Sequence, residues 1–87
     1  MKNLYKAQIH VQLKESVLDP QGQAVTNALH ELNFTEVQNV RIGKYIEVLL
    51  HSSDETDAKS QVKKYCETLL TNPVIETYQF QLEQIKE

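Results

Sequence analysis

The stretch VQNVRIGKYIEVLL, from Val37 to Leu50, decides the fold that this sequence predicts. β-Branched residues stand on both sides of Gly43, a pattern typical of two extended segments. The simplest interpretation is a β-hairpin that turns near Gly43, with one strand before the glycine and one after it.

A strand and a helix are predicted before this hairpin. From Tyr5 to Leu13 apolar and polar residues alternate, which indicates a strand with one buried face. Asp19 is a suitable N-cap and precedes a proline, so we expect a helix from about Pro20 to Leu32 that ends at Asn33. Its apolar residues recur at helical spacing and comprise Ala24, Val25, Ala28, Leu29 and Leu32.

A second helix and a last strand are predicted after the hairpin. The helix, residues 54–70, has an apolar stripe and should end at the Asn72-Pro73 break. Residues 74–82 return to an extended pattern, and residues 83–87 are expected to be a frayed tail. The stripe comprises Ala58, Val62, Cys66 and Leu69.

The predicted order is strand, helix, strand, strand, helix, strand, in a single domain over residues 1–87. Right-handed crossovers and this order favour the ferredoxin-like α+β fold, with a four-stranded antiparallel sheet and both helices on one face. No internal repeat is visible beyond the similarity of the two halves.

The third predicted strand is apolar on both sides, which two helices on one face do not explain. Tyr45 and Leu49 point one way, and Ile46, Val48 and Leu50 point the other. A strand that is apolar on both sides is typical of a sheet that is buried on both faces. We therefore predict that a partner or a second copy covers the open face. Ile46 and Val48 are therefore candidate partner contacts.

Composition bounds what the chain can do. Its 87 residues carry 9 Lys+Arg and 12 Asp+Glu, for a net charge of −3, and 40% of the residues are hydrophobic. A domain this small has room for one core but not also for a deep catalytic cavity, so a self-sufficient multistep enzyme is not expected.

No apolar run reaches the length of a membrane span and no secretory pattern opens the chain, so we predict a cytoplasmic protein. Because the single cysteine cannot form an internal disulfide, oligomerisation is the remaining way to bury more surface.

The candidate reactive residues also have plain structural interpretations. Cys66 is the only thiol and could be a nucleophile, but a position on an apolar helical stripe favours a buried structural role. His10, His30 and His51 lack the short spacing of metal ligands, so we predict no metal site.

The acidic residues can be assigned to helix starts. Asp54, Glu55 and Asp57 fall in the first turn of the second helix, where Ser52 and Glu55 also have capping-box spacing. Free N–H groups at the start of the first helix could hold an anion, but the Asp19 carboxylate competes for them.

Arg41 and Lys44 form a basic pair beside Gly43 in an otherwise acidic domain. The pair is either a contact for a partner subunit or a solvated pair on a hairpin, and we treat both residues as candidate partner contacts. The negative charge and scattered aromatic residues argue against RNA binding. An acylphosphatase-like enzyme would need an arginine in residues 14–21, and none is there.

Three stretches carry a resemblance to a known family. VQLKESVLDPQGQAV over residues 11–25, VRIGKYIE over residues 40–47 and CETLLTNPVIETY over residues 66–78 resemble the PurS family, the small subunits of phosphoribosylformylglycinamidine synthase. The match runs in order across nearly the whole chain. Asn33 stands where relatives often have glycine, a substitution that the same backbone conformation tolerates.

The resemblance implies a role in the fourth step of purine biosynthesis, in which formylglycinamide ribonucleotide, glutamine and ATP are consumed. In that family a glutaminase subunit carries the nucleophilic cysteine, and a large synthetase subunit binds ATP and magnesium. The small subunit is implied to be a noncatalytic homodimer that bridges the two and supports ammonia transfer, with no cofactor of its own. The alternative is a small-molecule sensor of the ACT type, which shares the expected fold and also dimerises.

Overall fold

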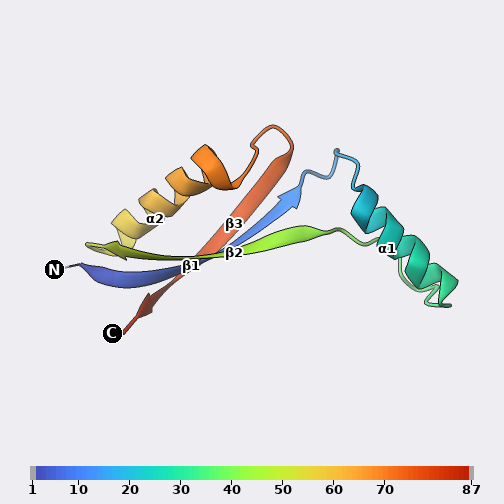
Figure 1. The fold of residues 1–87 in the computed structure, drawn as a ribbon, viewed down its shortest axis with the longest axis horizontal. Coiled ribbons are helices and arrows are strands. Elements are labelled where there is room, and N and C mark those ends of the chain that lie inside the picture. Colours follow the sequence, from blue (N-terminus) through green and yellow to red (C-terminus); the bar gives the residue numbers. More distant parts are fainter. Residues whose placement is uncertain (1, 87) are drawn as a thin grey trace.

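The computed structural model describes residues 2–86, which form three strands and two helices (Figure 1). In chain order these are β1 (Asn3–Leu13), α1 (Pro20–Glu31), β2 (Gly43–Ser52), α2 (Glu55–Tyr65), the π-helical turn η1 (Cys66–Leu70) and β3 (Glu76–Ile85). The sheet is antiparallel with β1 in the middle, in the order β2-β1-β3. The α+β class is confirmed, but the described residues contain no fourth strand.

The core lies between the sheet and α2. Apolar residues of β1 alternate into this layer, and Ile9 pairs with Ile46 of β2 and with Phe80 of β3. From α2 and η1 the predicted stripe supplies Ala58, Val62 and Cys66, all with 0% exposure. Burial of these apolar side chains is the main source of stability in so small a sheet.

The first helix forms where it was predicted but does not lie on the sheet. The helix that packs on the sheet is α2, whereas α1 projects beyond one end of it as a separate arm (Figure 1). The radius of gyration is 17.0 Å, against about 12 Å for a compact chain of this length. The expectation of two helices on one sheet face is therefore wrong for the single chain.

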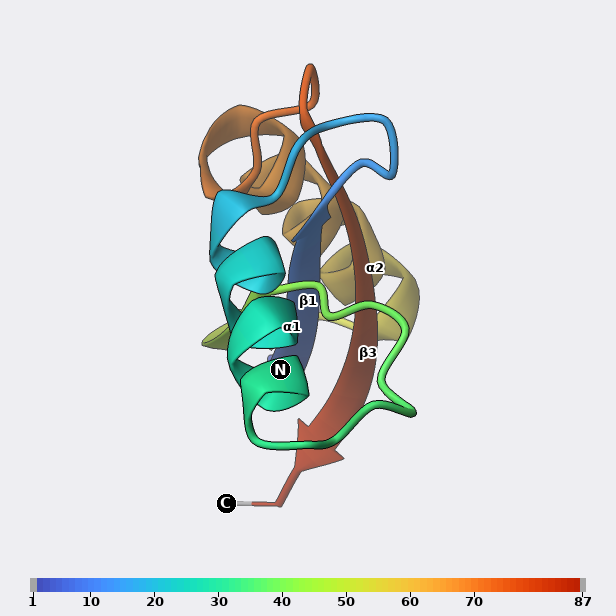
Figure 2. The same cartoon turned by 90° about the vertical axis from the view of Figure 1, so that its right-hand side faces the viewer.

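The predicted hairpin at Gly43 is also wrong. Residues 37–42 form no strand and run beside α1 instead (Figure 2). The backbone N–H of Val40 donates to Oγ1 of Thr26 at 3.0 Å, and Nε2 of His30 lies 2.6 Å from the carbonyl oxygen of Val37. These α1 side chains take the backbone groups that a neighbouring strand would have bound.

Gly43 has a role other than a turn. It begins β2 opposite Gln12, and a Cβ atom there would lie 2.5 Å from the carbonyl oxygen of Val11. The glycine therefore permits a close approach of β2 to β1. Over residues 2–86 neither glycine has a positive φ, and the left-handed position is Asn33, with φ 72°, as expected at the end of α1.

The last strand is longer than predicted. β3 continues to Ile85, which pairs with Leu4 at the start of β1. Residues 83–85 are thus in the sheet rather than in a frayed tail, because β1 starts early enough to give them a partner; Glu87 lies outside the described residues.

The sheet face opposite α2 is open, and most of its side chains are polar. On this face the edge strand β2 exposes two apolar side chains, Tyr45 and Leu49, whereas β1 and β3 present polar ones. The polar set comprises Lys6, Gln8, His10, Gln12, Thr77, Gln79, Gln81 and Glu83. Apolar residues on one strand therefore do not make this face a second core layer.

Candidate functional site

Arg41 is engaged within its own chain. Its Nη2 donates to the carbonyl oxygens of Leu13 at 2.6 Å and Lys14 at 3.1 Å, where β1 ends. The carboxylate of Asp19 accepts hydrogen bonds from the N–H groups of Gly22 and Ile42, and these two bonds lower the pKa of Asp19. Together these contacts form a joint between the sheet and the α1 arm, and the Asp19 carboxylate takes the helix-start N–H that an anion would use.

Lys44 borders this joint but takes part in none of the hydrogen bonds just described. Its Nζ is 3.7 Å from Oε2 of Glu76, and its side chain is 55% exposed. Arg41 and Lys44 thus do not project together from a turn, because no turn exists at Gly43. Lys44 has the exposure that a contact with another subunit requires, whereas Arg41 secures the arm.

Ile46 and Val48 face α2 and pack against the core. Val48 also lines a groove of about 480 Å³ between the edge strand β2 and the end of the second helix. Leu69 also lines the groove and is 81% exposed. The remaining lining residues are Gln61, Lys64, Tyr65, Thr68 and Leu70.

The largest departure from expectation is the apolar stripe of α1. The sequence pattern predicts that this stripe faces the core, yet Leu32 is 66% exposed and Ala24, Val25 and Ala28 are also exposed. Only Leu29 is half-buried. The pattern carries no signal that distinguishes a stripe covered by its own sheet from one left open for another chain.

Cys66 is fully buried, as predicted, and burial raises the pKa of its thiol. The three histidines lie on three different elements, β1, α1 and β2, and the His10 ring is 5.0 Å from that of Tyr45. Over residues 2–86 no group of three or more His, Cys, Asp or Glu side chains is arranged to hold a metal ion. The buried thiol is in a setting that suppresses the reactive thiolate.

The acidic residues at the start of α2 serve as caps, with one change from the expected pattern. The N-cap is Asp54, whose Oδ1 accepts from the N–H of Asp57 at 2.7 Å. Ser52 is buried and donates to the Asp57 carboxylate, and this hydrogen bond is the main cause that lowers the pKa of Asp57. The predicted capping box of Ser52 with Glu55 is therefore replaced by these two contacts.

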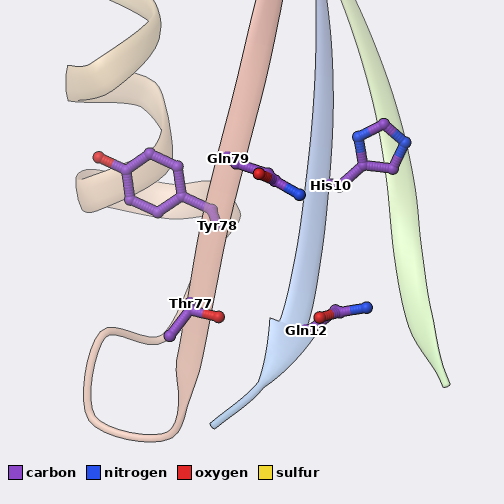
Figure 3. Close-up of a pocket in the computed structure, with 5 residues that line it drawn as sticks. All are labelled: His10, Gln12, Thr77, Tyr78 and Gln79. Carbon is purple, nitrogen blue, oxygen red and sulfur yellow. The ribbon is translucent and has the colours of Figure 1, made fainter. Parts of the chain in front are cut away.

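A shallow hollow of about 240 Å³ lies on the polar sheet face (Figure 3). Its polar lining comes from His10, Gln12, Thr77 and Gln79, while Tyr78 points toward the helical side of the sheet. These side chains offer hydrogen-bond donors and acceptors, which suit contact with a polar partner surface.

No helix over residues 2–86 has the length and apolar character needed to cross a membrane.

The geometry as a whole comprises an exposed helical arm, an apolar groove and a polar sheet face. These are features of a surface for protein contacts.

Comparison with known proteins identifies the family. The PurS subunit of phosphoribosylformylglycinamidine synthase from Bacillus subtilis is 52% identical over 82 residues, or 94% of this chain and 96% of the relative. A crystal form of B. subtilis PurS has a TM-score of 0.81 at 54% identity, covering 91% of this chain and 98% of that one. In the structure of PurLQS from Thermotoga maritima, a chain with 35% identity has a TM-score of 0.81 and covers 94% of this chain and 98% of its own length. A sequence model described as "PurS: Phosphoribosylformylglycinamidine (FGAM) synthase" matches residues 6–84, so this chain belongs to the PurS family.

Proposed function

We propose that this chain is the noncatalytic scaffold subunit of a phosphoribosylformylglycinamidine synthase complex in purine biosynthesis. In this proposal it acts in the cytoplasm as a homodimer that docks a glutaminase subunit onto an ATP-dependent synthetase subunit and supports transfer of ammonia between them. ATP, Mg²⁺ and the ribonucleotide belong to the synthetase, and the reactive cysteine belongs to the glutaminase. Family membership and the PurLQS relative support this assignment.

The observation that carries the proposal is the surface that the single chain leaves uncovered. Its accessible surface is 6474 Å², about 1,200 Å² more than the roughly 5,300 Å² of a compact chain of its mass. Permanent homodimers bury about 1,000 Å² or more on each partner. The excess therefore matches the area that one stable interface would remove from water.

The contact chemistry also supports a scaffold. The thiol of Cys66 is enclosed in the core and lines neither the hollow on the sheet face nor the groove beside α2. The exposed groups around the hollow on the sheet face are neutral amides, a hydroxyl and an imidazole. Such groups can form hydrogen bonds with a polar partner surface.

Reconstitution from three purified proteins tests the proposal. Glutamine-dependent formation of the amidine should require this chain together with the synthetase and glutaminase subunits, and all three should co-elute in size-exclusion chromatography. The isolated chain should release neither glutamate nor ADP above background. Full turnover without the chain would contradict the proposal, and a melting temperature raised by a free amino acid or nucleotide would favour the sensor alternative.

A further inference from the structure

We propose that the loop between η1 and β3, residues 71–75, is a preformed apolar knob that enters an uncharged apolar pocket on an enzyme subunit of the complex. The loop has the sequence TNPVI and contains the Asn72-Pro73 break that follows the second helix. Its exposed apolar side chains are Val74, at 75%, and Ile75, at 38%. This inference rests on the proposed scaffold function and goes further by naming a surface that an enzyme subunit binds.

The loop is closed by hydrogen bonds of its own. Oε1 of Glu76 accepts from the N–H of Asn72 at 2.7 Å, and Oδ1 of Asn72 accepts from the N–H of Val74 at 3.1 Å. The carbonyl oxygen of Asn72 accepts from the N–H groups of Ile75 and Glu76. Pro73 has no N–H, and its ring fixes φ. The two apolar side chains are therefore held in place before a partner arrives, and a rigid contact loses less entropy on binding than a flexible one.

The loop is also fixed to the rest of the fold at both ends. It stands at the end of the sheet where β1 stops (Figure 2). The backbone N–H of Lys14, just after β1, donates to the carbonyl oxygen of Ile75 at 2.8 Å. The N–H and the hydroxyl of Thr71 both donate to the carbonyl oxygen of Cys66, at the start of η1. Val74 is thus exposed by a fixed part of the fold.

The chemistry of the loop defines what can bind it. Every backbone N–H from Asn72 to Glu76 is bonded within the chain, so the loop offers neither an edge for an added strand nor N–H donors for an anion. No residue of the loop is charged, and the Glu76 carboxylate that closes it is paired with Nζ of Lys44 at 3.7 Å. What remains for recognition is apolar surface, which an apolar pocket matches without supplying a charge.

The size of this surface indicates a partner other than a second copy. A permanent homodimer buries about 1,000 Å² or more on each partner, far beyond what two side chains expose. The larger apolar surfaces of the chain, the stripe of α1 and the groove beside α2, include no residue of the loop. A contact this small acts as an anchor within a wider interface, where a few packed side chains carry most of the binding energy.

Titration of the full chain into an equimolar mixture of the synthetase and glutaminase subunits tests the knob. Val74→Asp should raise the dissociation constant of assembly about tenfold or more. Its melting temperature should stay nearly unchanged, because the side chain is 75% exposed. Val74→Thr keeps the shape and adds a hydroxyl, so it should weaken assembly several-fold. Leu18→Asp is the matched control, at 77% exposure on a different loop, and should stay within about twofold of the wild type.

Photo-cross-linking identifies what lies against the loop. In Val74→Cys, a maleimide-linked benzophenone should label only the new thiol, because the native Cys66 is fully buried. On illumination of the assembled complex, the label should form a covalent bond to the synthetase or to the glutaminase subunit. The dissociation constant of the homodimer, from sedimentation, should be the same for Val74→Asp and the wild type within about twofold.

The outcomes separate this inference from the proposed function. A wild-type chain that binds neither enzyme subunit removes both. Normal assembly of the wild type with equal affinities of Val74→Asp and Leu18→Asp overturns the knob alone. A cross-link to a second copy, or a homodimer weakened by Val74→Asp, would assign the loop to the contact between copies and would also overturn it.

Discussion

Oδ2 of Asp19 accepts a hydrogen bond of 2.9 Å from the backbone N–H of Ile42, a residue 23 positions further along the chain. The other carboxylate oxygen accepts from the N–H of Gly22 in the first turn of α1. One side chain therefore ties the start of α1 to the point where the chain returns to the sheet. The direction of the arm depends on this joint and on the neighbouring bonds of Thr26 and Arg41.

Replacing Thr26 with valine should loosen the arm. The Thr26 hydroxyl is buried, donates to the carbonyl oxygen of Gly22 and accepts from the N–H of Val40. Valine has the same shape but leaves both backbone groups without this partner, at a cost of about 1 to 3 kcal/mol in the free energy of unfolding. Urea unfolding measures the loss, and Thr26→Ser is the control that keeps the hydroxyl. Equal stability of the two variants would contradict the prediction.

Acid should weaken the joint through Asp19. Hydrogen bonds from Gly22 and Ile42 lower the pKa of Asp19 in the folded chain below its unfolded value of 3.8. Its contribution to stability is therefore present above that value and is lost as the pH falls through the lower folded pKa. Asp19→Asn should be less stable than the wild type at pH 7, and the difference in the free energy of unfolding should narrow as the pH falls below 3.8. Unfolding free energies across this range test the claim, which a difference independent of pH would refute.

Cys66→Ser should affect stability and not chemistry. The substitution places a hydroxyl in the apolar core, which costs about 1 to 3 kcal/mol. In a reconstituted complex, glutamine-dependent turnover should stay within a few fold of the wild type once the variant is saturating. Cys66→Ala is the apolar control. Loss of turnover with unchanged assembly would mean that the thiol takes part in the reaction.

Substitutions of Arg41 and of Lys44 should have different effects on the stability of the chain. Arg41→Glu removes the hydrogen bonds to Leu13 and Lys14 and should lower the melting temperature, because the arm joint loses its guanidinium. Lys44→Glu changes an exposed side chain with one weak ion pair, so stability should stay within about 0.5 kcal/mol.

If Lys44 contacts a partner subunit, its reversal to glutamate should weaken assembly roughly tenfold, and excess chain should restore turnover. Affinity for the synthetase and glutaminase subunits, measured for both variants, checks this. If Lys44→Glu binds both subunits with unchanged affinity, Lys44 is not a partner contact. That result would not bear on Ile46 and Val48, which pack against the core.

The sequence alone determined the features that depend on neighbours along the chain. Alternation in residues 5–13 predicted β1, the Asp19-Pro20 pair predicted the start of α1, and Asn33 predicted its end. Each of these follows from local periodicity or from the backbone preference of one residue. The burial of Cys66 was predictable for the same reason, since helical spacing places it on the apolar stripe of the predicted helix over residues 54–70.

Only the tertiary structure decided which surfaces these elements cover. Residues 37–42 have the composition of a strand, yet strand formation requires a partner, and the α1 side chains bound their backbone groups instead. The apolar stripe of α1 is a second example. Its helical periodicity would be the same whether the stripe packed on its own sheet or on another chain. Burial depends on contacts between distant segments, and no local pattern specifies whether those segments belong to one molecule or to two.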